Sequence, residues 1–138
     1  MLSSMNSGFL VAASVFVSIG ALIHLYIFVL ESVLWSRPRT WRTFGMKNQE
    51  DANTVRPMAL NQGFYNLFLA IGAAVGLVLL WIGMTQAGAA LVFLGAGSMV
   101  LAALVLIVSS PKLARAALLQ GAAPLVGIIL LVLALTTA

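Results

Sequence analysis

Two long apolar stretches of this chain contain several polar side chains that could carry protons or bind a ligand. They include the only histidine and one of the three acidic residues. An imidazole and a carboxyl group that can pair in a dry protein interior could carry protons or hold a polar ligand, with amides and phenols to orient it. The polar residues of the two stretches are His24, Tyr26, Glu31, Asn61, Gln62, Tyr65 and Asn66.

The spacing of these residues predicts two helix faces that match. His24, Glu31 and Trp35 are separated by intervals that fall on one face of an α-helix. Gln62 and Asn66 are one helical turn apart in the second stretch. Because consecutive spanning helices are antiparallel, we expect the two polar faces to meet.

Depth along each helix predicts which residues are level. At 1.5 Å per residue, Glu31 lies about 6 Å and His24 about 16 Å from the charged end of the first helix. In the second helix Asn61 lies about 6 Å and Asn66 about 14 Å from that end. We therefore expect Glu31 level with Asn61, and His24 level with Asn66, while Gln120 of the last helix joins the Glu31 layer. The predicted binding or proton-coupling set is His24, Tyr26, Glu31, Asn61, Gln62, Tyr65, Asn66 and Gln120.

Composition predicts the elements that position this set. Hydrophobic residues make up 62% of the 138 residues and charged residues only 7%, which is too few to cover a water-facing surface. A spanning helix needs about 20 mostly apolar residues. The sequence therefore predicts an all-α fold, a four-helix transmembrane bundle forming a single domain over residues 1–138. The predicted spans are 8–35, 57–82, 87–108 and 117–135.

Charge orients this bundle. All seven basic residues fall in the first and third connections, which lie on the same side of a four-span protein. Under the positive-inside rule that side is cytoplasmic and both termini lie on the non-cytoplasmic side. The net charge of +4 is therefore attributed to topology, and no nucleic-acid partner is predicted. The basic residues are Arg37, Arg39, Arg42, Lys47 and Arg56 in the first connection, and Lys112 and Arg115 in the third.

Local signals refine the elements. Pro57 is expected in the first turn of the second span, where its missing N–H costs nothing. Asn48 is expected to cap a short helix within the first connection. Gly72 and Gly76 form a GxxxG motif, which predicts close helix packing more firmly than dimerisation.

Several chemistries have no support in the sequence. The absence of cysteine excludes thiol nucleophiles and zinc–thiolate sites. No HExxH motif, nucleophile elbow or phosphate-binding glycine loop is present. One histidine and one nearby carboxylate cannot fill a dinuclear metal site. No metal, cofactor or catalytic residue is therefore predicted.

Three blocks of the sequence resemble a known family. They are His24–Glu31 with Trp35 following, Asn61–Ala70, and Gln120–Pro124 with Gly127. Together they resemble the bacterial integral membrane family named domain of unknown function 1304. The resemblance covers nearly the whole chain and implies a small four-span protein. With the charge pattern, it predicts a multi-pass protein of the bacterial cytoplasmic (inner) membrane, and it supplies no activity.

Three functions compete at this stage. The first is a proton-linked carrier or efflux protein for small molecules, working as a homo-oligomer because four helices enclose little space. The second is a membrane enzyme acting on a lipophilic substrate, with His24 or Glu31 as acid–base, or with His24 as an axial haem ligand. The third is a structural or partner-binding subunit whose polar cluster fixes helix register. The carrier ranks first, with the lipid bilayer and a small-molecule substrate as its partners.

The charge pattern makes a topological prediction. A reporter fused after the last residue should read out on the non-cytoplasmic side, because both basic connections are expected in the cytoplasm. Paired alkaline phosphatase and green fluorescent protein fusions measure this. Fluorescence without phosphatase activity would contradict the orientation.

Overall fold

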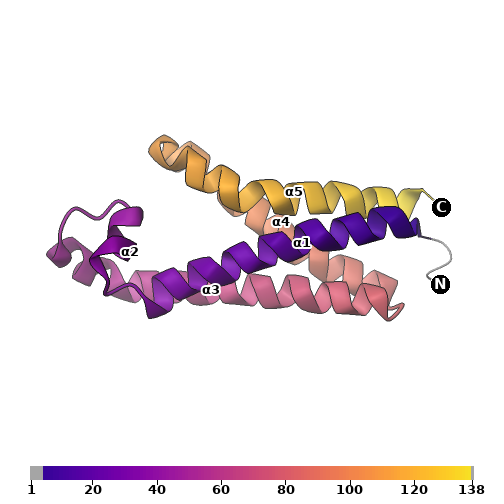
Figure 1. Cartoon of the computed structure of the whole chain (residues 1–138), viewed down its shortest axis with the longest axis horizontal. Coiled ribbons are helices and arrows are strands. Elements are labelled where there is room, and N and C mark those ends of the chain that lie inside the picture. The colour runs from indigo at the N-terminus through magenta and orange to yellow at the C-terminus, as the bar shows by residue number, and fades with distance from the viewer. Residues whose placement is uncertain (1–4, 138) are drawn as a thin grey trace. The chain divides into compact units, whose positions relative to one another are not determined.

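The computed structural model describes residues 5–137, and the regular structure within them is entirely helical (Figure 1). The elements are α1 (Ser7–Phe28), the π-helix η2 (Val29–Val33), α2 (Pro38–Thr43), α3 (Gln49–Trp81), α4 (Thr85–Ser109), the 3₁₀-helix η3 (Pro111–Leu113) and α5 (Ala114–Thr136). Four helical segments are long and apolar enough to cross a membrane, namely Ser7–Val33, Gln49–Trp81, Thr85–Ser109 and Pro111–Thr136. The predicted all-α class with four spans is confirmed.

The described chain divides into two compact units. The first comprises residues 1–23 and 69–138 within the described range, and the second comprises residues 24–68. The sequence predicted one domain over residues 1–138. The helices α1 and α3 both contribute to each unit, and the units are described separately below.

In the first unit, α3 and α4 are in backbone contact at two glycines. A Cβ added to Gly88 would lie 2.6 Å from the backbone nitrogen of Leu80 and 2.8 Å from the carbonyl oxygen of Gly76. A Cβ added to Gly76 would lie 2.8 Å from the backbone nitrogen of Val92. Only glycine fits at these positions, so van der Waals contact between backbones holds this pair of helices.

Small residues also join α5 to α1. A Cβ on Gly127 would lie 2.6 Å from the Val17 side chain, and a Cβ on Gly20 would lie 2.7 Å from the Pro124 ring. At the ends of the chain the Asn6 N–H donates to the Ala134 carbonyl at 3.0 Å. In Figure 1, α5 accordingly runs beside the N-terminal half of α1. The two ends of the described chain therefore lie together, which is compatible with an even number of spans.

The GxxxG motif of α3 is only half engaged. Gly76 lies in the contact with α4, but around Gly72 a Cβ would meet no described atom within 4 Å. On α4, Gly95 packs against the Ala73 backbone, whereas a Cβ on Gly97 would also face open space among the described residues. The sequence correctly predicted close packing, and geometry selects which glycines provide it.

Aromatic side chains form the core of the second unit. Trp35 and Trp41 are buried together with Ala52 and Ala59. The Trp35 indole N–H donates to the Ala52 carbonyl at 2.8 Å, and its ring lies 5.4 Å from that of Phe44 between centroids. These contacts anchor the connection between α1 and α3 onto the first turns of α3.

The helix α3 begins at Gln49, whereas the sequence placed the start of this span at Pro57. Asn48 caps it, because its side-chain Oδ1 accepts from the Asp51 N–H at 2.8 Å. Glu50 and Asp51 in the first turn add a favourable interaction with the helix dipole. The cap predicted for a short separate helix thus starts the long one. Pro57 lies inside α3, where it removes one backbone donor without ending the helix.

The glycine contact makes a prediction about stability. Gly88→Ala should lower the free energy of unfolding by about 1–3 kcal/mol, since the new methyl group would overpack against the α3 backbone. Thermal or denaturant unfolding in detergent measures this. Gly97→Ala, on the same helix but facing open space, is the matched control and should be neutral or slightly stabilising. Equal effects of both substitutions would contradict the packing.

Candidate functional site

Glu31 lies in a π-helical turn at the end of the first span. The Leu34 N–H donates to the Val29 carbonyl at 2.9 Å, five residues back, instead of to the residue four back. Such turns are rare and occur frequently at functional sites, because the extra residue changes the directions of the side chains that follow. The turn therefore sets the position of Glu31 in a way that a regular helix would not.

A glycine of α3 lets this turn approach closely. A Cβ added to Gly63 would collide with the Ser32 hydroxyl oxygen and lie 3.1 Å from the Glu31 Cβ. The same Ser32 hydroxyl donates to the Leu60 carbonyl at 3.0 Å. The absence of a side chain at Gly63 thus makes the notch into which the π-turn fits.

The Glu31 carboxylate is held by an amide. Asn66 Nδ2 donates to Glu31 Oε2 at 3.0 Å and also to the Gln62 carbonyl at 3.0 Å. The second bond fixes the amide with its donor group toward the acid. Since the partner is neutral, the carboxyl group can keep this bond whether it is ionised or protonated, because an oxygen remains as acceptor in both forms.

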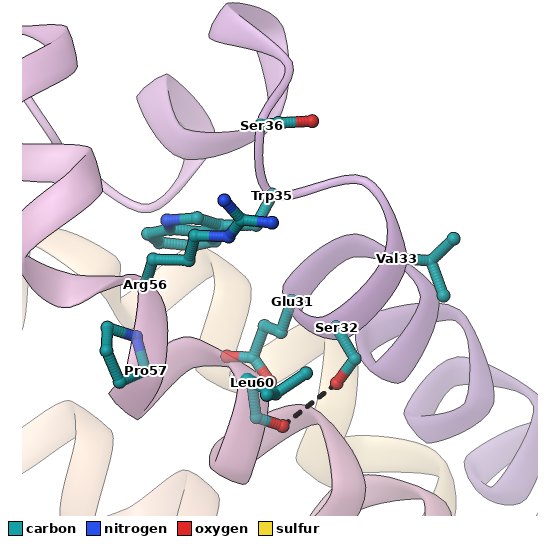
Figure 2. Close-up of a pocket in the computed structure, with 8 residues that line it drawn as sticks. All are labelled: Glu31, Ser32, Val33, Trp35, Ser36, Arg56, Pro57 and Leu60. Carbon is teal, nitrogen blue, oxygen red and sulfur yellow. Dashed lines mark hydrogen bonds between the residues drawn. The ribbon is translucent and has the colours of Figure 1, made fainter.

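A cleft of about 260 Å³ opens beside Glu31 (Figure 2). Ligand pockets for drug-sized molecules usually measure about 300–1,000 Å³, so this cleft suits a smaller molecule. Trp35 lines the cleft, but its N–H is already used by Ala52 and only 5% of its surface is exposed. The lining residues are Glu31, Ser32, Val33, Trp35, Ser36, Arg56, Pro57 and Leu60.

The cleft contains two charged groups whose bonding capacity is unused. Among residues 5–137, the Arg56 guanidinium makes no hydrogen bond or ion pair, and Glu31 Oε1 has no partner either. Figure 2 shows the guanidinium and the carboxylate lying apart along the cleft. A carboxylate and a guanidinium cation therefore line the same cleft without forming an ion pair.

The structure brings the side chains of Glu31 and Asn66 together, as their faces predicted. The sequence placed Glu31 level with Asn61 and Gln62, and Asn66 level with His24. In the structure the Glu31 Cβ lies 3.1 Å from where a Cβ on Gly63 would be, next to Gln62, and its carboxylate reaches along α3 to Asn66.

The rest of the predicted set is dispersed. His24 is buried, with 1% of its surface exposed, and it does not line the cleft. Tyr26 and Tyr65 are 61% and 63% exposed, and the Asn61 and Gln62 side chains are also exposed. Gln120 lies half-buried on α5 and belongs to the first unit, whereas Glu31 belongs to the second.

Sequence reasoning missed four residues of the site. Arg56 was attributed to topology, Trp35 was placed on the helix face of Glu31 but not in the predicted binding set, and Ser32 and Gly63 were given no role. For Gly63 a signal existed, because it lies inside the Asn-Gln-Gly block that resembles a family motif. No residue pattern in the sequence predicts the π-turn. The position of Ser32 depends on this turn and therefore could not be predicted.

The fold and the four apolar segments define an all-helical, multi-pass membrane protein. Residues 18–132 match the family described as "Protein of unknown function (DUF1304)", and the chain belongs to this family. The matched range includes both Glu31 and Asn66. No curated protein and no solved structure matches the chain.

The Glu31–Asn66 bond makes a prediction for a double-mutant cycle. Glu31→Ala and Asn66→Ala should show a coupling of about 0.6 kcal/mol in unfolding free energy, the average for hydrogen bonds between spanning helices. Unfolding in detergent of both single variants and the double variant measures it.

The control cycle replaces Asn66→Ala by Asn61→Ala. The Asn61 side chain is exposed and makes no hydrogen bond within residues 5–137, so its coupling to Glu31 should be zero. Equal coupling in the two cycles would mean that the bond does not stabilise the protein.

Proposed function

We propose that this protein is a proton-linked carrier for small molecules in the bacterial cytoplasmic membrane, with Glu31 as the group that binds and releases the proton. The observation that supports it most is a carboxyl group at the end of a span, bonded by a neutral amide and open to a cleft. Ionisable residues within spanning helices commonly mark ion and substrate pathways.

The neutral partner suits a coupling role. A carboxylate bonded to arginine would be held ionised by the adjacent charge. Asn66 imposes no such charge, so protonation of Glu31 does not break an ion pair. A substrate that competes with the proton for the same carboxyl group would then be exchanged for it, which is the minimum that coupled transport requires.

The length of α3 supports a place for the cleft at the membrane boundary. Its 33 residues measure about 50 Å, whereas the hydrocarbon core of a bilayer is about 30 Å thick. The end that protrudes is the N-terminal one, because it carries Glu50, Asp51 and Arg56. Under the positive-inside rule this end is cytoplasmic, and the cleft would load and release on that side.

A second copy of the chain would complete the path. In the first unit, the contacts of Gly76 and Gly88 leave no space for a polar solute between α3 and α4. Two helices in such close contact enclose no route across the bilayer between them. We therefore assign the route to a homo-oligomer, with the lipid bilayer as its surroundings.

The proposal predicts the behaviour of reconstituted protein. Liposomes containing pyranine and an imposed pH gradient are exposed to amino acids, amines, organic acids and ethidium in turn. At least one solute should accelerate the collapse of the gradient, and Glu31→Gln should reduce this coupled flux to the level of empty liposomes. The glutamine keeps an acceptor for Asn66 but cannot exchange a proton.

The matched control is Glu50→Gln in the exposed first turn of α3, which should transport like the wild type. Unchanged flux in Glu31→Gln would refute the coupling role. Failure of every solute to change the gradient would refute the carrier.

A further inference from the structure

We infer that the cleft binds a free zwitterion, a small molecule that carries an ammonium group and a carboxylate or phosphate, with the ammonium at Glu31 and the anion at Arg56. This inference rests on the proposed carrier function and names its substrate class. The juxtaposition that supports it is an acid and a base that line one cleft of about 260 Å³ without pairing.

The free bonding capacity of Glu31 and Arg56 defines which ligand groups would bind in the cleft. Glu31 Oε1 is an acceptor without a partner within residues 5–137, since Asn66 engages only Oε2. A primary ammonium group, which has three donors, satisfies such an oxygen. The Arg56 guanidinium has five donors and likewise no partner within the described range. Its planar fork matches a carboxylate or a phosphate in bidentate geometry.

The remaining lining limits the size and the polarity of the ligand. The Ser32 hydroxyl is engaged by the Leu60 carbonyl and the Trp35 N–H by the Ala52 carbonyl. Apart from the two charged groups, the cleft therefore offers mainly the aliphatic surface of Val33, Pro57 and Leu60, and Ser36 adds one hydroxyl. A short carbon chain between two charged ends fits this pattern better than a sugar, which would need several further polar partners.

The order of the two charges distinguishes a free solute from a lipid. Asn66, which bonds Glu31, follows Arg56 along α3 by about 15 Å in the direction of the apolar part of the helix. The ammonium would thus lie deeper than the anion. In an aminophospholipid the phosphate is attached to the glycerol and the ammonium lies beyond it, so the order would be reversed. The cleft therefore favours a soluble zwitterion over a lipid headgroup.

The test compares whole zwitterions with their halves. Binding of glycine, β-alanine and phosphoethanolamine to the purified full chain in detergent is measured by calorimetry, beside ethylamine for the ammonium and acetate for the anion. At least one zwitterion should bind roughly tenfold or more tightly than either half, since each charged contact adds to the other. Equal affinities for zwitterions and halves, or no binding of any zwitterion, would overturn the inference.

Matched variants assign the two ends. Glu31→Gln and Arg56→Gln should each reduce zwitterion affinity roughly tenfold or more, to the level of one half-molecule. Arg42→Gln is the control in the same unit, because Arg42 lies over the Trp41 ring, 5.1 Å from its centroid, and outside the cleft. An equal loss in Arg42→Gln would overturn the assignment to the cleft. Unfolding temperatures of the variants identify any that fail to fold. If one of Glu31→Gln and Arg56→Gln does not fold, the zwitterion affinity of the other tests the assignment.

Two further arms separate the alternatives. Phosphatidylethanolamine that remains bound in native mass spectra, is lost in Arg56→Gln and is not displaced by any free zwitterion would overturn the assignment to a soluble ligand. The pyranine liposomes are then supplied with the zwitterion that binds most tightly. Binding without proton-coupled flux would refute the carrier and leave the ligand class standing. Coupled flux of ethylamine or acetate alone, equal to that of the zwitterion, would refute the ligand class and leave the carrier standing.

Discussion

In the hydrocarbon of a membrane, an apolar side chain gains nothing by leaving lipid for the surface of another helix, so close backbone approach and a few hydrogen bonds have to hold the spans together. The first unit follows the first route. Its helices meet where Gly76, Gly88, Gly127 and Gly20 leave no side chain between them. The mass of leucine, isoleucine and valine in this chain gives solubility in lipid rather than cohesion between helices.

The second unit combines close backbone approach with hydrogen bonds between helices, and it contains the candidate site. Gly63 provides the notch, and the π-turn brings Ser32 and Glu31 into it, where hydrogen bonds to α3 replace apolar contact. A turn with an extra residue cannot pack as regularly as an α-helix, and the irregularity leaves a cleft beside it. Contact and opening thus lie side by side, because Gly63 admits the π-turn and the cleft opens beside Glu31.

Composition and periodicity were enough for the architecture, because the need for long apolar helices in lipid is absolute. They also placed Glu31 opposite the amide-rich face of α3, since both faces follow from a 3.6-residue repeat. They did not predict that the Glu31 side chain would reach along α3 to Asn66, or that α3 would start at Gln49 rather than at Pro57. They also failed for Arg56, because a charge in a connection has an ordinary topological explanation and only coordinates show that it faces an acid across a cleft.

The hydrogen bond from Asn6 to the Ala134 carbonyl brings the two ends of the described chain to one place. A second copy joined there by a short linker would enter the bilayer from the same face as the first and adopt the same orientation. Duplication of the gene in tandem would therefore yield a covalent pair of parallel subunits, whereas a protein with an odd number of spans would invert its second half. Two copies of this chain can thus be fused into one polypeptide. A substitution can then be introduced into one copy while the other copy stays unchanged.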